Sequence, residues 1–422
     1  MRIGFLSASG QLGGAETCLL DMCASLRDAT PDWPLFLVTA ADGPLIERAQ
    51  ALGVTVRVEP FPAAVARLGE TGMTQAGGAI RFAGQVGLAV GPIASYAEAL
   101  GRALAPFQPD LVHTNGLKMH LLGAHAANAP VVWHVHDYLG SRRVSQKLLR
   151  WNVGRCAAVI ANSDSVAADV RAALGASVEV TRIYNAVDLA RFSPHGDALD
   201  LDRLAGLAPA PAATVRVGLL ATFARWKGHE TFLRAMASLP ADFPIRAYVI
   251  GGPVYQTEGS QCAIDELRAL ADRLRVSDRV GFTGLVARAD AALRALDVAV
   301  HASTSPEPFG LVIAEAMACG RAVVVSAAGG ATELVTPGVD ALVHAPGSAA
   351  ELAEAIRALA NDPERRASFG HAARETALRR FDRARLATEL APVYERAARL
   401  STCSGRADTA GGELVEPRAP LR

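Results

Sequence analysis

The most specific signal in the sequence is the stretch Pro306-Glu-Pro-Phe-Gly-Leu-Val-Ile-Ala-Glu-Ala-Met-Ala-Cys-Gly320. A loop rich in Pro and Gly follows a predicted strand here and leads into a short helix that Gly320 can terminate. The first N–H groups of such a helix have no intrahelical acceptor, so those from Phe309 to Val312 can receive an anion. Glu307 and Glu315 are eight residues apart, one in the loop and one in the helix. The two carboxylates can therefore hold different parts of one extended ligand.

Short apolar runs rich in β-branched residues recur on both sides of this stretch, with segments of helical periodicity between them. This alternation is typical of parallel strands joined by crossover helices. The predicted strands of a first series are residues 2–7, 35–39, 54–58, 111–113, 131–135, 157–161 and 178–183. Those of a second series are residues 215–220, 246–250, 280–282, 298–300, 322–326 and 341–343. The sequence therefore predicts two doubly wound α/β units.

These units divide the chain into domains. We predict a first domain over residues 1–190, a linker rich in Pro, Gly and Ala over 191–213, and a second domain over 214–380. A closing helix over 381–400 and a disordered tail over 401–422 follow. Because open parallel sheets bind ligands beyond the carboxyl ends of their strands, we expect a functional cleft between the two domains.

The composition excludes several classes of protein. Lys plus Arg and Asp plus Glu both total 42, so the chain has no net positive charge to attract nucleic acid. The six cysteines form no C-x-x-C pair, which favours a reducing compartment and predicts neither disulfides nor a zinc site. The N-terminal run is broken by Gly and Ser, and no apolar stretch approaches the roughly 18 residues of a membrane span. We therefore expect a cytoplasmic protein.

The stretch around Glu307 resembles the E-x7-E motif of the retaining glycosyltransferases of family 4, within E-P-F-G-x3-A-E-A-M-A-x-G. The resemblance implies the GT-B fold, two Rossmann-like doubly wound domains that face each other across a cleft. Further matches follow in order over residues 1–385, which makes the resemblance much more specific than any single motif. They are Gly13-Gly-Ala-Glu16, His136-Asp137, Asn162-Ser163, Ile183-Tyr-Asn-Ala-Val-Asp188, Lys227-Gly228, Ile250-Gly-Gly252, Gly281-Phe-Thr-Gly284 and Gly329-Gly-Ala-Thr-Glu-Leu-Val335.

The resemblance also implies roles for the residues of the motif. Glu315 would accept hydrogen bonds from the nucleotide ribose, and Glu307 would hold the donor sugar. The backbone of Phe309, Gly310 and Leu311 would complete the nucleotide-sugar site. A helix terminus supplies only about half a positive charge, so a nucleoside diphosphate needs side-chain cations as well.

The predicted cation is Lys227, one of only three lysines in the chain. In similar enzymes this loop reads G-R-x4-K-G, with both the arginine and the lysine on the diphosphate. Here Ala221 and Thr222 stand at the glycine and arginine positions, which is a departure from the pattern. Either Arg225 replaces the missing guanidinium, or Arg225 is a surface residue and Lys227 is the main cation for the leaving group.

The first domain carries weaker signals. By resemblance, Gly14 would lie over the diphosphate and His136 would line the cleft near the sugar, although a buried core histidine is the alternative for His136. His134 and His136 lie on one strand face, but no further ligand lies at a matching spacing nearby, so we predict no metal site. His113 and Lys118 are candidates for the acceptor side or ordinary loop residues.

A basic patch lies in a stretch without acidic residues from Tyr138 to Ser163. Such a patch can contact anionic lipid headgroups or a lipid-diphosphate acceptor, and its alternative is a solvated helix face. The basic residues are Arg142, Arg143, Lys147, Arg150 and Arg155.

Taken together, we predict a retaining hexosyltransferase that moves a sugar from a UDP or GDP donor to a hydroxyl acceptor, without metal or cofactor. Lipid-linked compounds are among the acceptors considered, and polysaccharide, glycolipid or other glycoconjugate synthesis is the setting. We expect Lys227, Glu307 and His136 at the catalytic centre, a cytoplasmic location with peripheral contact at the inner membrane face, and no nucleic-acid partner. A non-catalytic sugar-nucleotide-binding subunit of a polysaccharide assembly complex and a GT-B epimerase are the alternatives.

Overall fold

A seven-stranded parallel sheet forms the first domain in the computed structural model, which describes residues 1–68, 78–176, 178–253 and 261–407. The strand order is β3-β2-β1-β4-β5-β6-β7. The strands are β1 (Ile3–Ser7), β2 (Leu35–Thr39), β3 (Thr55–Val58), β4 (Leu111–Asn115), β5 (Val131–Val135), β6 (Cys156–Ala161) and β7 (Val180–Arg182). The central strands are buried on both faces, which explains their continuous apolar sequences.

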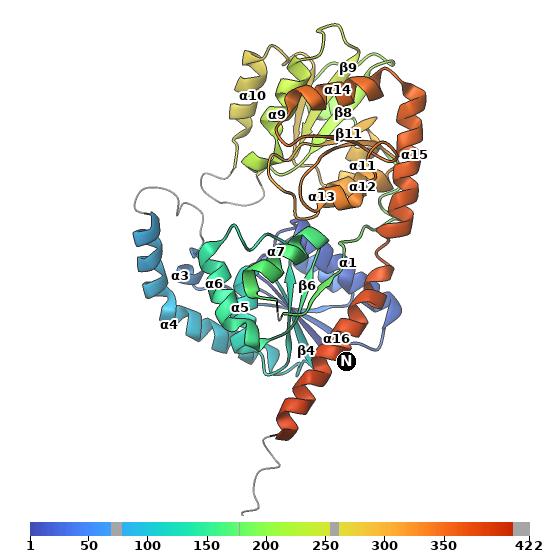
Figure 1. Cartoon of the computed structure of the whole chain (residues 1–422). Helices are drawn as coiled ribbons and strands as arrows, with labels where there is room; N and C mark the ends of the chain where they lie inside the picture. Colours follow the sequence, from blue (N-terminus) through green and yellow to red (C-terminus); the bar gives the residue numbers. More distant parts are fainter. Residues whose placement is uncertain (69–77, 177, 254–260, 408–422) are drawn as a thin grey trace, which may run out of the picture.

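Helices cover both faces of this sheet (Figure 1). One apolar core involves α4, α5, α6 and α7, and the other involves α1 and α2. The helices are α1 (Gly14–Ala29), α2 (Pro44–Ala51), α3 (Ala63–Ala66), α4 (Gly78–Leu104), α5 (Leu117–Ala126), α6 (Arg143–Asn152) and α7 (Asp164–Leu174), with the 3-10 turn η1 (Val153–Arg155).

The second domain has a six-stranded parallel sheet in the order β10-β9-β8-β11-β12-β13. Its strands are β8 (Val215–Leu220), β9 (Ile245–Ile250), β10 (Val280–Gly284), β11 (Val298–His301), β12 (Ala322–Ser326) and β13 (Leu342–His344). Its helices are α8 (Leu201–Leu204), η2 (Arg225–Lys227), α9 (His229–Ala237), α10 (Ile264–Arg273), α11 (Ala289–Arg294), α12 (Leu311–Ala318), α13 (Ala331–Leu334), α14 (Ala349–Ala360) and α15 (Pro363–Arg380). Each predicted apolar run overlaps one strand, so the predicted pair of doubly wound domains is confirmed.

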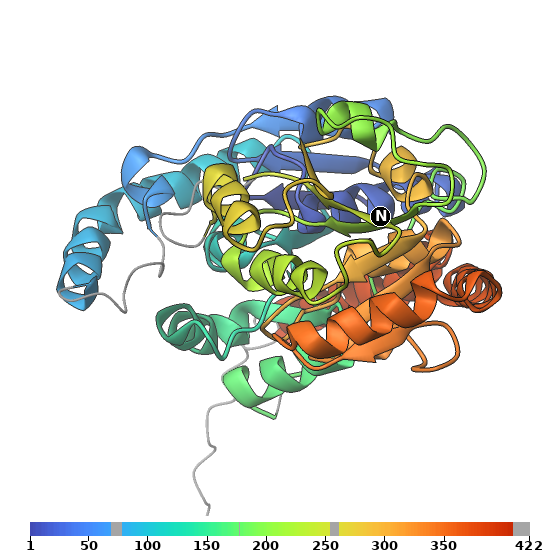
Figure 2. The ribbon, with the colours of Figure 1, turned by 90° about the horizontal axis from the view of Figure 1, so that it is seen from above.

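The two domains present their functional edges to each other. In each sheet the strand order reverses beside the first strand of that domain, between β1 and β4 and between β8 and β11. Ligands of doubly wound sheets bind at such switch points, beyond the carboxyl ends of the strands. Viewed from above, the second domain lies over the first (Figure 2).

The C-terminal helix α16 (Arg385–Ala407) returns to the first domain, along whose side it runs (Figure 1). Leu390, Val393 and Tyr394 pack there in the same core as α1. The closing helix predicted over 381–400 therefore begins later and continues further, and residues 401–407 are helical rather than part of a disordered tail. Each residue added to a formed helix gains a hydrogen bond at low cost, which explains the extension. The rest of the predicted tail, 408–422, lies outside the described residues.

Within the described residues, no helix combines the length and the apolar character needed to cross a lipid bilayer.

Candidate functional site

The loops after β8 and β11 place a lysine against a glutamate. Gly228 follows η2 with a φ of +78°, in the left-handed region. A Cβ at Gly228 would lie 1.8 Å from the carbonyl oxygen of Ala302, so only glycine lets the two loops lie this close. Lys227 Nζ donates to both carboxylate oxygens of Glu307, at 2.9 and 2.7 Å.

Glu307 is buried and held by more than the lysine. Ser303 Oγ donates to its Oε2 at 2.8 Å, and His301 Nε2 lies 3.1 Å from the same oxygen. Burial alone would raise the pKa of Glu307, but Lys227 and His301 outweigh burial and hold it well below its ordinary value. The carboxylate is therefore ionised at neutral pH and can act only as a hydrogen-bond acceptor.

The N-terminus of α12 lies beside this ion pair. Gly310 is the N-cap with a φ of +90°, and the N–H groups of Leu311 and Val312 are the first of the helix. Phe309 is buried and anchors the loop, with its ring centroid 6.0 Å from that of Tyr184. The helix end and Lys227 together form a positively polarised pocket wall that suits an anion.

Glu315 lies on the same helix but in a different electrostatic environment. Its exposed fraction is 9%. Burial raises its pKa to about 7, and Asp290 adds to the rise while Arg191 opposes it. The two carboxylates of the motif therefore differ at neutral pH, since Glu307 is ionised and Glu315 is close to half protonated.

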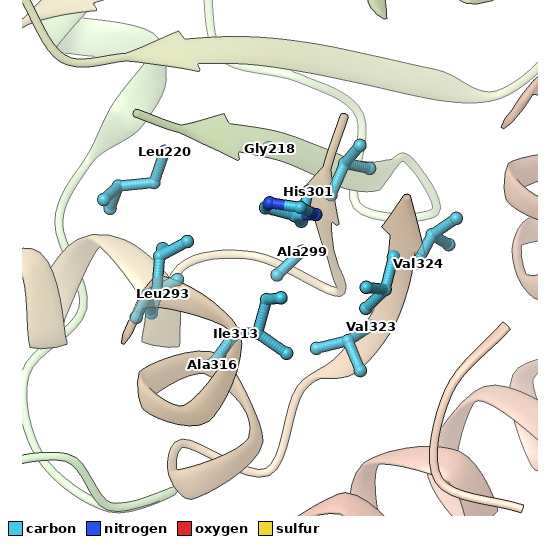
Figure 3. A pocket seen from close by; sticks show the side chains of 12 residues that line it. Gly218, Leu220, Leu293, Ala299, His301, Ile313, Ala316, Val323 and Val324 are labelled. Atoms are coloured by element: carbon cyan, nitrogen blue, oxygen red, sulfur yellow. The ribbon is translucent and has the colours of Figure 1, made fainter. Parts of the chain in front are cut away.

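A small cavity lies between α12 and the strands beneath it (Figure 3). His301 and Ile313 are among the residues that line it, and its other walls are mostly apolar. Its volume is about 10 Å³, which is barely room for one water molecule. This cavity cannot hold a sugar nucleotide, so a ligand of Lys227 and α12 must lie in the cleft above it.

The first domain contributes the turn before α1. Gly14 is exposed at the first position of α1, and a Cβ placed on it would meet no atom within 4 Å. The Glu16 carboxylate accepts a hydrogen bond from the N–H of Gly13 at 3.2 Å and so fixes the turn. The space in front of Gly14 leaves room for a ligand to approach the backbone, and its place over a diphosphate stays a prediction.

Tyr138 connects the His136 segment to the second domain. Its hydroxyl lies 2.9 Å from Ser165 Oγ and donates to the carbonyl of Glu307 at 3.3 Å. His136 is two residues away and partly buried, and its ring nitrogens are shielded, with no hydrogen-bond partner among the described residues. Burial lowers the pKa of His136 to about 4, so the imidazole is neutral at physiological pH. Its role at the sugar remains a prediction.

Glu333 closes the same interface from the second domain. Its carboxylate accepts hydrogen bonds from the backbone N–H groups of Asp164 and Ser165, at 2.8 and 2.7 Å. These N–H groups belong to the N-terminus of α7, where negative charge is stabilised. The contact holds the first domain against the loop that carries Glu307.

Arg225 does not join the Lys227 cluster. Its guanidinium forms an exposed ion pair with Glu266 at 3.1 Å. The proposal that Arg225 replaces the arginine missing at Thr222 therefore requires this pair to open and stays a prediction.

The two acceptor candidates differ in position. His113 is fully buried, with Nδ1 2.9 Å from the hydroxyl of Tyr394 on α16, so the prediction that it contacts an acceptor is wrong for this structure. Side chains alternate between the two faces of a strand, and the His113 side chain on β4 points into the core. Lys118 lines a large cavity, and its Nζ donates to the carbonyls of Val65 and Ala66 at 3.1 and 2.8 Å.

The prediction of no metal site rests on the lack of a further ligand at a matching sequence spacing, and it stays a prediction, but the fold adds a candidate ligand from a distant segment. The fold brings Cys18 of α1 to β5, and one ligand atom from each of the three residues lies within 4.8 Å of the others. Sequence spacing could not show this, because Cys18 is more than 100 residues away. In this structure the Cys18 thiol donates to Asn185 Oδ1 at 3.1 Å.

Sequence reasoning missed Ser303, His301 and Tyr138 as members of the site. His301 ends β11 and Ser303 follows two residues later, so their place at the carboxyl end of a strand was the available signal. Nothing in the sequence linked Tyr138 to Glu307, since the two are 169 residues apart.

Two doubly wound domains that face each other across a cleft define the GT-B class of proteins, and here paired carboxylates and a helix N-terminus lie at that cleft. Residues 214–376 match the family model "Glycosyl transferases group 1", and residues 12–191 match "Glycosyltransferase Family 4". The alpha-maltose-1-phosphate synthase of Mycobacterium tuberculosis is 31% identical over 291 residues, which cover 66% of this chain and 73% of that protein. The chain belongs to glycosyltransferase family 4.

Other relatives support the same assignment. The D-inositol 3-phosphate glycosyltransferase 2 of Catenulispora acidiphila is 36% identical over 247 residues, covering 56% of each chain. The matched region spans about half the length of the first curated relatives, 56% and 42% of the two proteins. The crystal structure of Anabaena HepE in complex with UDP-glucose is similar with a TM-score of 0.74 and 29% identity, covering 95% of this chain and 100% of that one.

Proposed function

We propose that this protein is a retaining glycosyltransferase that moves a hexosyl group from a nucleoside-diphosphate sugar to a hydroxyl acceptor. The observation that carries the proposal is the Lys227–Glu307 ion pair beside the N-terminus of α12. It combines a cation and helix amides for a diphosphate with an ionised carboxylate for sugar hydroxyls. UDP is the favoured nucleotide, because HepE was crystallised with UDP-glucose.

The proposed reaction exchanges partners at the ion pair. The donor diphosphate takes the place of Glu307 on Lys227, while Glu307 accepts hydrogen bonds from the sugar. The bond between the anomeric carbon and the phosphate oxygen then breaks, and the acceptor oxygen bonds to that carbon on the same face. The acceptor proton goes to the departing phosphate, because neutral His136 is a poor base at a pKa of about 4.

Stabilisation of the leaving diphosphate is then the main catalytic contribution. Lys227 and the amides of Leu311 and Val312 supply fixed positive charge in a partly desolvated site. We propose that no metal ion is needed for the transfer. Turnover that persists at full rate after dialysis against EDTA would support this, and restoration of a lost rate by Mg²⁺ or Mn²⁺ would contradict it.

The donor site is tested by thermal stabilisation with UDP, GDP and their glucose derivatives, followed by release of UDP in the presence of candidate acceptors. We expect a shift with one nucleotide in wild type that Lys227→Ala and Glu315→Ala lose. Lys147→Ala is the matched control, because Lys147 is an exposed lysine on α6. Absence of any shift in wild type would contradict the proposed donor site.

A second candidate function is a non-catalytic subunit that binds sugar nucleotides. The observation that favours it is the missing arginine at Thr222, together with the ion pair that holds Arg225 on Glu266. Nucleotide binding without measurable sugar transfer or donor hydrolysis would favour this candidate.

We also propose a cytoplasmic location with peripheral contact to anionic membrane. In support, the described cysteines form no disulfide, and α6 exposes Arg143, Lys147 and Arg150 together with Trp151. Basic residues beside an exposed tryptophan suit a lipid headgroup region. Flotation with vesicles rich in phosphatidylglycerol should fail for the variant in which the three basic residues are replaced by Gln, and flotation equal to wild type would contradict the proposal.

A further inference from the structure

A large cavity lies in the first domain, away from the Lys227 cluster. Its volume is about 1250 Å³, which exceeds the roughly 300–1,000 Å³ of most small-molecule sites. Its walls come from α4, α5 and α6, which lie on one side of the first domain (Figure 1). The walls are mainly apolar, and their residues include Val90, Ile93, Ala97, Leu121, Val144 and Leu148.

The cavity reaches the carboxyl edge of the first sheet. Ala15 beside Gly14, Gly116 after β4 and His136 after β5 all line it. The hydroxyl of Tyr138, two residues from His136, contacts Glu307 across the cleft. The cavity therefore leads from the surface of α4 and α6 to the place where the sugar of a donor would lie.

Polar side chains line the cavity in two places, one with Lys118, His136 and Arg142, and one near the C-termini of α5 and α6, where His125 and Asn152 lie 2.8 Å apart. Lys118 contributes a cation whose Nζ donates to two carbonyls and lies 5.3 Å from the Phe61 ring centroid. Burial lowers the pKa of Lys118. Arg142 is paired with Asp137 at the same cavity wall. Between the two polar regions the wall is apolar, so an occupant with a polar group at the His136 end and an apolar body along Ile93, Leu121 and Leu148 would match it.

The outer wall indicates where such an occupant comes from. Helix α6 turns Val144 and Leu148 toward the cavity, and it exposes Lys147 and Trp151 beside them and Arg150 further round the helix. The tryptophan side chain is 79% exposed. A cationic and aromatic rim beside an apolar cavity is complementary to the anionic surface of a bilayer.

We propose that this cavity binds the hydrocarbon chain of a lipid-linked acceptor, with the hydroxyl to be glycosylated placed at the His136 end. The inference rests on the proposed sugar transfer and names the acceptor class for it. Each methylene that the cavity removes from water should tighten binding about fourfold, until the chain outgrows the cavity.

The experiment measures binding of butyl, hexyl, octyl and decyl phosphate, below their micellar concentrations, with inorganic phosphate as the reference. Ala94→Trp fills the cavity from an exposed position on α4. Ser95→Trp is the matched control, because Ser95 is exposed on the same helix and does not line the cavity. UDP stabilisation is measured on all three proteins.

We expect affinity to rise with chain length in wild type and in Ser95→Trp, and to fall at least tenfold for decyl phosphate in Ala94→Trp. UDP stabilisation should be equal in all three. Affinity that does not depend on chain length, or decyl phosphate affinity unchanged in Ala94→Trp, would overturn the inference. A chain-length effect without any UDP shift would instead overturn the proposed donor site and leave the cavity assignment intact.

Discussion

Replacing Glu315 by Gln should change the pH dependence of stability in a predictable direction. Burial raises the pKa of Glu315 from 4.5 to about 7 in the folded protein. The folded state therefore binds more protons than the unfolded state between these two values, and stability falls as pH rises through that window. The substitution removes the titration and keeps the shape of the side chain.

The size of the effect follows from the shift. A difference of 2.5 pKa units corresponds to about 3 kcal/mol, of which about 2 to 3 kcal/mol lies between pH 5 and pH 8. Relative to wild type, Glu315→Gln should gain that amount in free energy of unfolding over this interval. Burial also raises the pKa of Asp21 to about 7, and the Glu315 charge adds to that rise. Removing the charge in Glu315→Gln should lower the pKa of Asp21, which adds to the variant's relative gain in free energy of unfolding as pH rises.

The assay is urea unfolding of wild type and Glu315→Gln at pH 5 and pH 8, followed by circular dichroism. If the difference in unfolding free energy between the two proteins is the same at both pH values, Glu315 does not titrate as inferred. Calorimetry adds an independent check. Binding of UDP to an ionised Glu315 at pH 7 should release about half a proton, and the variant should release none from this site.

Three further predictions concern the loop contacts. Lys227→Ala should lower the free energy of unfolding by about 2 to 3 kcal/mol, because it leaves a buried carboxylate without its cation. It should also weaken UDP binding about 10- to 100-fold. Urea unfolding and calorimetry measure the two effects, and Lys147→Ala should match wild type in both. Glu307→Gln should weaken binding of UDP-glucose but not of UDP, because the amide no longer competes with the diphosphate for Lys227; an equal loss for both ligands in calorimetry would contradict the proposed exchange of partners. Gly228→Ala should lower the melting temperature and the affinity for UDP together, since its Cβ would overlap the carbonyl of Ala302; wild-type values for both would show that the loop can move apart.

The fold was predictable because it depends on periodicity that each segment carries by itself. Buried parallel strands are apolar on both faces, so runs such as Val131–Val135 stand out from the helices between them. The E-x7-E stretch was informative for the same reason, because a loop and a short helix fix the relation of Glu307 to Glu315 locally. The match of Lys227 to its loop pattern predicted the third residue of the candidate site, beside Glu307 and Glu315.

The remaining features depend on contacts between distant segments. Cys18 meets His134 because α1 packs on a face of the first sheet, and His113 contacts Tyr394 because α16 returns to the same face. Arg225 was a reasonable replacement for a missing guanidinium by spacing, but Glu266 on α10 is close enough to pair with it. No local pattern encodes which neighbour a side chain will meet after folding.

The two carboxylates of the motif differ in protonation, which suits them to different parts of the ligand. Glu307 is next to Lys227, Ser303 and His301, so its charge is retained despite burial, and it can exchange a cation for sugar hydroxyls without changing protonation. Among the described residues no hydrogen bond holds the Glu315 carboxylate, and Arg191 only partly offsets the burial that raises its pKa to about 7, so a ligand that favours the ionised form makes it a full acceptor. Donor binding should therefore strengthen with rising pH through Glu315, while the Lys227–Glu307 pair stays intact down to acidic pH. A pH profile of UDP affinity that is flat from pH 6 to pH 8 would contradict this division.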